Sequence, residues 1–197
     1  VNPWPRPLQQ PHPPIWVPGT GSPETIVWAA QRRYPYLQVY SPVKTIAKAF
    51  DDYRAAALAA GYTASPKQLG WMTLVYVADT DAAAWEQAEP HALYLFQKLS
   101  KRPLEIYLPP GYLSLDPLVQ QARVEKVKSR QRTFGELVQD GFIILGSPTT
   151  VTEQLRAHAR EMGFGIFCAL LHFGSLPADF TRRNLELFAK EVMPHFR

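Results

Sequence analysis

Four times along this chain, an apolar run of strand length is followed by a pattern of helical period. The runs are residues 14–17, 36–40, 71–78 and 165–172, and the helical patterns that follow them begin near residues 22, 41, 80 and 178. Strands that alternate with helices form parallel sheets covered by helices, so the pattern predicts an α/β fold. We expect the four strands to lie parallel and adjacent in chain order, joined by right-handed crossovers.

The number of units limits the architecture. The sequence has neither the glycine-rich fingerprint of a dinucleotide-binding fold nor a P-loop. A closed (β/α)8 barrel needs eight strand–helix units, and about four are visible, which favours half a barrel. Because the chain starts with Val1 in a proline-rich stretch, we interpret it as a fragment. We expect its open edges to be closed by a missing segment, by another chain or by disorder.

An insertion of about 40 residues separates the third helical pattern from the last strand, and it spans roughly residues 102–141. Long loops of this kind usually cover a site, so we predict a lid over the carboxyl ends of the strands. After it come the apolar run 142–145 and an amphipathic helix with Val151 and Leu155 on its buried face. In the helix before the insertion, Pro90 is expected to cause a kink or a break.

Two stretches place Gly-Ser-Pro between an apolar run and a helix: "GTGSPET" at residues 19–25 and "GSPTT" at residues 146–150. In both, the serine fits the N-cap position and the proline the first helical position. Helix N-termini also bind anions, and glycines allow a ligand to approach the backbone closely. The first stretch follows a predicted sheet strand, at the end where barrel enzymes bind ligands. Spacing alone leaves both interpretations open, a capped helix or an anion site.

Two further side chains end predicted strands. Tyr40 closes the second strand and His172 the fourth, so both are candidates for ligand contact, although hydrogen-bonded structural roles stay open. No histidine pair has metal-ligand spacing with a third ligand, so we expect no metal site. The sequence has no G-x-S-x-G motif, which argues against an α/β-hydrolase.

Composition excludes several classes of partner. No apolar run reaches the roughly 18 residues that a membrane span needs, so we expect no membrane partner. The net charge of +4 is mild. The basic stretch 123–132 is typical of a solvated helix face, and we expect no nucleic-acid partner. The single cysteine, Cys168, fits a buried, inert thiol in a reducing compartment, so we expect a cytoplasmic protein.

Three segments together resemble one family. They are "PRPLQQPHPPIWVPGTGSPETIVWAA" (residues 5–30), "DGFIILGSPTTVTEQL" (140–155) and "LELFAKEVMPHF" (185–196). In order and spacing they are similar to the middle and the C-terminal end of luciferase-like flavin-dependent monooxygenases. The resemblance implies a TIM (β/α)8 barrel of the luciferase-like type, of which this chain covers about strands 5 to 8. Residues 1–197 would then be the C-terminal half of one barrel domain, with the insertion after strand seven.

The resemblance also implies a function. Members of the family use reduced FMN, or in one branch F420, and often oxygen, to oxidise small organic molecules. The flavin phosphate would lie at Thr20, Gly21 and Ser22, whereas the turn at residues 146–150 would only begin an outer helix. Tyr40 and His172 are the substrate candidates, and the catalytic residues stay unknown because the missing N-terminal half would supply them.

The resemblance extends to partners. We expect that missing half of the barrel, a flavin reductase, a small-molecule substrate and further copies of the protein in a homo-oligomer. The isolated half is expected to be inactive. Two alternatives stay open: an F420-dependent oxidoreductase of the same fold, and a non-catalytic flavin-binding or assembly subunit.

Overall fold

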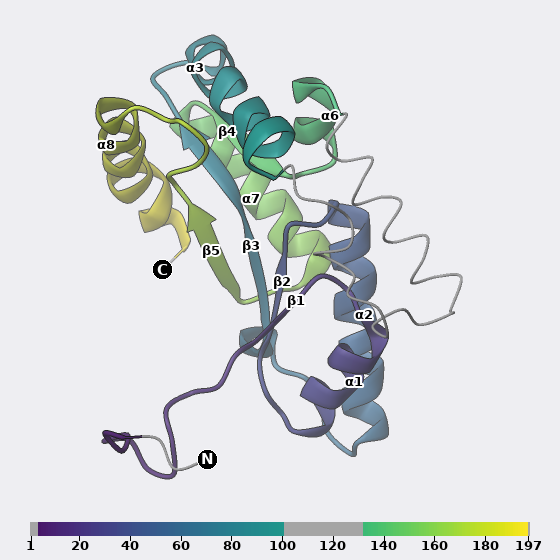
Figure 1. The fold of residues 1–197 in the computed structure, drawn as a ribbon. Helices are drawn as coiled ribbons and strands as arrows, with labels where there is room; N and C mark the ends of the chain where they lie inside the picture. Colours follow the sequence, from purple (N-terminus) through teal and green to yellow (C-terminus); the bar gives the residue numbers. More distant parts are fainter. Residues whose placement is uncertain (1–3, 101–131, 197) are drawn as a thin grey trace.

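The computed structural model describes residues 4–100 and 132–196, which form one parallel sheet with helices on both faces (Figure 1). Its strands are β1 (Val17–Gly19), β2 (Tyr36–Val39), β3 (Leu69–Val77), β4 (Ile143–Gly146) and β5 (Ile166–Leu170). β1 pairs with β2, β2 with β3, and β3 with β5, all in parallel. The predicted order of the four strands is therefore confirmed.

The first strand begins later than predicted. The sequence analysis placed it at residues 14–17, but β1 starts at Val17. Pro13 and Pro14 precede it, and proline has no N–H to donate to a ladder. Pro18 is tolerated within β1 because this strand lies at the edge of the described sheet.

The sheet has one strand more than the four predicted, and that strand is β4. β3 is long enough to pair with β2 through Leu69–Met72 and then with β4 through Leu74–Val77. Along Leu74–Val77, the edge of β3 that faces β5 is hydrogen-bonded by the side-chain amide of Asn184. It accepts from the Val77 N–H and donates to the Val75 carbonyl. β4 therefore lies on the β2 side of β3, beyond the carboxyl end of β2.

The helices begin close to where the patterns predict them. They are α1 (Pro23–Gln31), α2 (Val43–Ala59), α3 (Asp81–Tyr94), α6 (Phe134–Gln139), α7 (Pro148–Met162) and α8 (Ala178–Leu187). Short helical turns η1 (Pro66–Gln68), η2 (Leu95–Leu99), η4 (Phe188–Val192) and η5 (Met193–Phe196) complete the described elements.

Pro90 does not split α3, which continues to Tyr94. Pro90 and Glu86, whose carbonyl loses its helical donor, are both exposed, so water can satisfy that carbonyl. On the opposite face, Ala84, Ala88 and Ala92 are fully buried and hold the helix in place. The expected break is therefore absent.

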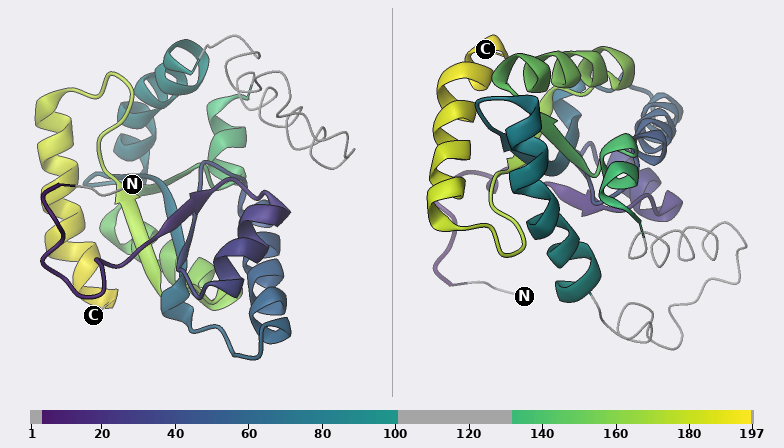
Figure 2. Two further views of the ribbon diagram at one scale, coloured as in Figure 1. Left: turned by 60° about the horizontal axis from the view of Figure 1, so that its bottom comes forward. Right: turned by 90° about the horizontal axis from the view of Figure 1, so that it is seen from above.

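Side chains of β3 alternate between two cores. Trp71, Val75 and Val77 pack into a cluster with side chains of α1, α2 and α7. Leu74 and Tyr76 point the other way, into a cluster with side chains of α3 and α6. Figure 2 shows α3 and α7 on opposite sides of the sheet. Helices thus cover both faces at the carboxyl end of β3.

One face of the sheet is only half covered toward the amino ends of the strands. Gly70 has no room for a side chain, because a Cβ there would come within 2.8 Å of Leu37 and 2.9 Å of Trp16. Leu37, Trp16, Met72 and Cys168 are all partly exposed, so the expectation that Cys168 is buried was wrong. Among the described strands, β1 and β5 do not pair with each other, so the sheet does not close into a barrel.

The predicted lid lies mostly outside the described residues, which resume at residue 132. The end of the insertion forms α6, which begins with a capping box between Thr133 and Glu136. In residues 4–100 and 132–196, no helix combines the length and the hydropathy required to cross a bilayer.

Candidate functional site

The candidate residues follow the carboxyl ends of three strands. Thr20–Ser22 come after β1, Tyr40 after β2 and His172 after β5. Because the strands are parallel, all three positions lie at the same edge of the sheet. β1 and β2 are neighbours, whereas β3 separates β2 from β5 (Figure 1). Tyr40 is therefore the candidate on the strand next to the turn.

The structure explains why residues 19 and 21 of the turn are both glycine. At Gly19 a Cβ would come within 2.5 Å of the Tyr36 hydroxyl oxygen, so the close approach predicted for a ligand is made here by a phenol. Gly21 has φ +101°, a backbone conformation that favours glycine. Its amide donates to the Tyr36 hydroxyl at 3.1 Å. Gly21 is one of the three residues at which the phosphate was expected, and in the structure its amide already has a partner.

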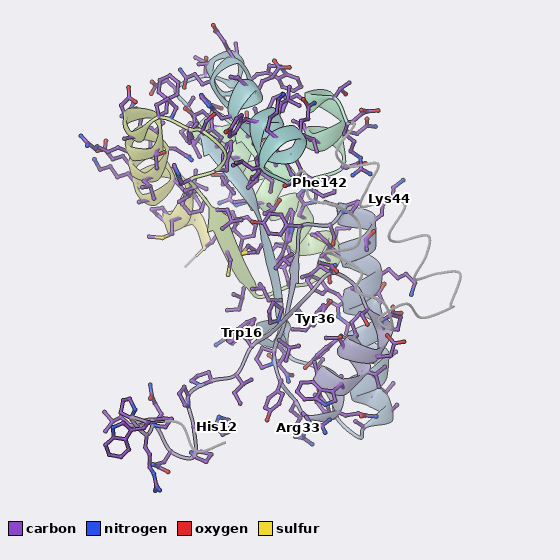
Figure 3. All side chains as sticks on the ribbon, in the orientation of Figure 1. His12, Trp16, Arg33, Tyr36, Lys44 and Phe142 are labelled. Atoms are coloured by element: carbon purple, nitrogen blue, oxygen red, sulfur yellow. The ribbon has the colours of Figure 1, made fainter. Side chains whose placement is uncertain are left out.

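That bond begins a chain of hydrogen bonds. The Tyr36 hydroxyl donates to Gln38 Oε1 at 2.6 Å, and Gln38 Nε2 donates to Ser41 Oγ at 2.9 Å. Ser41 Oγ in turn donates to the Val39 carbonyl at 3.0 Å. Tyr36 and Gln38 are fully buried, and burial raises the pKa of Tyr36 to about 12, so it stays protonated at neutral pH. Figure 3 labels Tyr36.

The start of α1 holds a carboxylate of its own. Ser22 is the N-cap residue and Pro23 the first helical residue, as predicted, but the Ser22 side chain caps no backbone amide. Its hydroxyl donates to Glu24 Oε2 at 2.7 Å instead. This bond and the Glu24 amide lower the pKa of the Glu24 carboxyl. Both residues are exposed, so an external anion could replace the carboxylate.

The second Gly-Ser-Pro turn, at the start of α7, is closed differently. Ser147 Oγ caps the helix by accepting from the Thr150 amide. Asp81, from the first turn of α3, accepts from the Ser147 amide at 2.6 Å and from the Thr150 hydroxyl at 3.0 Å. These bonds, the Ser147 amide first, lower the pKa of Asp81. The interpretation of this turn as a capped helix start is confirmed.

The two remaining candidates differ in how they are held. Tyr40 has φ +46°, which is uncommon for a residue with a side chain, and it is 46% exposed. His172 is exposed, and its Nδ1 lies 2.9 Å from the Thr181 hydroxyl on α8. The structure thus links Tyr40 to the turn through its neighbour Ser41 and holds His172 against α8.

The sequence analysis missed Tyr36, Gln38, Glu24 and Asp81. One signal was available for Gln38, a polar residue inside the apolar strand "YLQVY". Within residues 4–100 and 132–196, no group of three histidine, cysteine or acidic side chains could hold a metal ion.

Comparison with known proteins decides the family. The sequence model of the luciferase-like monooxygenases matches residues 1–165 of this chain. The chain belongs to that family. The curated 3,6-diketocamphane 1,6-monooxygenase of Pseudomonas putida is 26% identical over 172 residues, which cover 84% of this chain and 42% of the relative. The family resemblance noted in the sequence is thereby confirmed.

Solved structures show the fold. The monooxygenase RslO1 from Streptomyces bottropensis superposes with a TM-score of 0.68 at 19% identity, over 96% of this chain and 50% of its own. The oxygenating constituent of the 3,6-diketocamphane monooxygenase of Pseudomonas putida, a type II Baeyer–Villiger enzyme solved with FMN, gives 0.63 at 25% identity, over 92% and 48%.

The F420-dependent tetrahydromethanopterin reductase of Methanopyrus kandleri gives 0.58 at 16% identity, over 93% and 51%. The luciferase-like chain therefore spans about half the length of these structures and less than half of the curated relative. Its open parallel sheet is part of a luciferase-like TIM barrel, as predicted.

Proposed function

We propose that the protein is a flavin-dependent monooxygenase that uses reduced FMN and oxygen on a small organic substrate. The family match supports it, together with the monooxygenase relative and the related structure that holds FMN. The observation that carries the proposal is the strand–turn–helix at Thr20–Ser22, which lies inside the matched region and presents exposed hydroxyls at the start of α1.

The residues at this turn fit a phosphate, provided that the phosphate replaces the Glu24 carboxylate as the partner of Ser22. The Thr20 and Ser22 side chains are exposed, and the N-terminal end of α1 is favourable for negative charge. Pro23 offers no N–H, and the Gly21 amide is directed to Tyr36. Ser22 must release Glu24 before it can donate to a phosphate. Glu24 is exposed and can rotate away.

FMN, when bound, would supply the redox chemistry by which oxygen is used. This chain's own residues would hold its phosphate at Thr20 and Ser22 and keep the turn in shape. We propose Tyr40 and His172 as contacts to the substrate or the flavin, because both follow strands at the edge that carries the turn.

The first alternative is an F420-dependent oxidoreductase, which the likeness to the Methanopyrus kandleri reductase favours at the level of fold. The second is a non-catalytic flavin-binding or assembly subunit. For the monooxygenase we further propose the rest of the barrel, a flavin reductase, further copies of the protein and a small molecule as partners, because the chain spans only about half of its relatives.

Binding and turnover in the intact protein distinguish these functions. Flavin fluorescence gives the affinities for FMN and F420, and oxygen consumption with reductase-supplied reduced FMN gives the activity, with 3,6-diketocamphane as the first substrate probe. A monooxygenase binds FMN more tightly and consumes oxygen in step with substrate oxidation. Preference for F420 would support the first alternative, and FMN binding without oxidation of any substrate tried would support the second.

A further inference from the structure

Two polar side chains of β2 are buried on the face that packs against the helices. Tyr36 and Gln38 are both fully inaccessible, and Tyr36 belongs to the same core cluster as Phe50 and Trp71. A polar group in such surroundings costs free energy unless it is hydrogen-bonded. The bonds that satisfy them run to Gly21 and Ser41, in the segments that follow β1 and β2.

The direction of each bond follows from the last member. The Ser41 hydroxyl donates to the Val39 carbonyl, so it accepts from the Gln38 amide nitrogen. That turns Gln38 Oε1 toward Tyr36, whose hydroxyl must then donate to it. The phenol oxygen is left as an acceptor for the Gly21 N–H. Ser41 and Gln38 thereby leave the phenol oxygen free to accept from the Gly21 amide.

We propose that Tyr36 and Gln38 are positioning residues, which hold the Thr20–Gly21–Ser22 turn in the shape that binds the flavin phosphate. The inference rests on the proposed function. The Gly21 N–H is fixed toward the interior at a residue with φ +101°, while the hydroxyls of Thr20 and Ser22 stay on the exposed side. The same chain ends at Ser41, next to Tyr40, so it also ties the turn to the second candidate segment.

Tyr53 offers a matched comparison within the same core. Its ring stacks on that of Tyr36 with centroids 6.4 Å apart, and it is equally buried. Its hydroxyl, however, donates to the Tyr34 carbonyl, just before β2 begins. Tyr53 therefore serves the amino end of the strand, while Tyr36 serves the turn at the carboxyl end. Each phenylalanine variant removes one buried hydroxyl, and only one of them touches the turn.

The test compares Tyr36→Phe with Tyr53→Phe in the intact protein. Flavin fluorescence gives the dissociation constants for FMN and for riboflavin, which has no phosphate, and hydrogen exchange reports the protection of residues 19–22 without ligand. Tyr36→Phe loses the bonds to Gly21 and to Gln38, but only the Gly21 bond holds the turn. Its loss should weaken FMN relative to riboflavin by about 2- to 10-fold and increase exchange at the turn. Tyr53→Phe should leave both unchanged.

Several outcomes would overturn the inference. One is that Tyr36→Phe increases hydrogen exchange at residues 19–22 but leaves the ratio of the FMN and riboflavin dissociation constants the same as in the unmodified protein. Another is an equal loss in both variants, which would indicate general destabilisation of the core. If Tyr36→Phe does not fold, Ser41→Ala removes the far end of the chain and should give a smaller FMN-specific loss, and its absence would also overturn the inference.

If the proposed function itself is wrong, the same titrations give a different result. An intact protein that binds FMN no more tightly than riboflavin has no phosphate site at this turn. There would then be nothing for Tyr36 and Gln38 to position.

Discussion

The two Gly-Ser-Pro turns share their local sequence and differ in what occupies the helix start. At α7 the occupant is Asp81, which comes from another helix and binds two donors. At α1 it is Glu24, which comes from the same first turn and accepts from the Ser22 hydroxyl. Both carboxylates are exposed, but Asp81 joins two helices and is part of the fold, whereas Glu24 contacts only its own turn's Ser22 hydroxyl in this way and can exchange with a ligand. Equal motifs therefore give neither equal side-chain capping nor the same occupant at the helix start.

The largest effect that would sharpen this comparison is on FMN affinity. Ser22→Ala removes a charge-assisted hydrogen bond to the proposed phosphate, so FMN should bind roughly 10- to 150-fold more weakly. Riboflavin should be affected much less. Ser147→Ala is the control: it should leave FMN binding unchanged but cost about 1 kcal/mol of stability, because Ser147 caps its helix and Ser22 does not. Fluorescence titration and thermal unfolding measure both. An FMN-specific loss in Ser147→Ala would reverse the assignment.

The next effect is on stability at the closed turn. Asp81→Ala leaves the Ser147 amide and the Thr150 hydroxyl without their partner. Because Asp81 is exposed, we expect a loss of about 1–2 kcal/mol rather than the full value for a buried charge. Urea unfolding of the intact protein measures it. An unchanged midpoint would show that water replaces the carboxylate at no cost and that the two turns are equally open.

A smaller effect is expected from the carboxylate that competes with the ligand. Glu24→Gln keeps the size of the side chain and removes its charge, so a phosphate at Ser22 meets less repulsion. FMN affinity should rise by about 1.5- to 5-fold, more so at low ionic strength. Asp81→Asn is the matched control, with no change expected. Weaker FMN binding in Glu24→Gln would mean that the carboxylate assists the site.

The smallest effect is a pH dependence. The Asp81 pKa lies below its ordinary value of 3.8 in the folded protein, so the folded state favours the charged form. Its contribution to stability is therefore present above pH 3.8 and is lost as the pH falls through the lowered value. The difference in unfolding free energy between the unmodified protein and Asp81→Asn should shrink over that range. A constant difference would place the stabilisation elsewhere.

Much of the fold could be predicted because apolar runs and helical periods are local signals. β3, for example, is a nine-residue strand of mostly buried residues, "LGWMTLVYV", and it was predicted almost in full. β4 was not counted because its apolar run follows the insertion, and four apolar residues become recognisable as a strand only through their pairing with β3.

The candidate site was harder to predict, since its contacts depend on register. The turn itself could be located from its glycines and its Ser-Pro pair. That the Gly21 amide meets Tyr36 depends on how β1 and β2 align. Whether the Ser22 hydroxyl caps the helix or donates to Glu24 depends on the Ser22 rotamer, which the spacing of residues in the sequence does not specify. The Asp81 contact joins helices 66 positions apart in sequence.

The Asn184 side chain has a consequence for association between molecules. Past the end of β5, the peptide groups of β3 on that side would be open, and open strand edges invite pairing with other chains. The Asn184 amide stands in for a neighbouring strand there, since it bonds Val75, Val77 and Leu171. A long strand is thereby shielded from adding a foreign strand at its far end. Replacing Asn184 with an apolar residue would leave the peptide groups of Val75 and Val77 without these bonds. We expect such a variant to aggregate before it loses flavin binding.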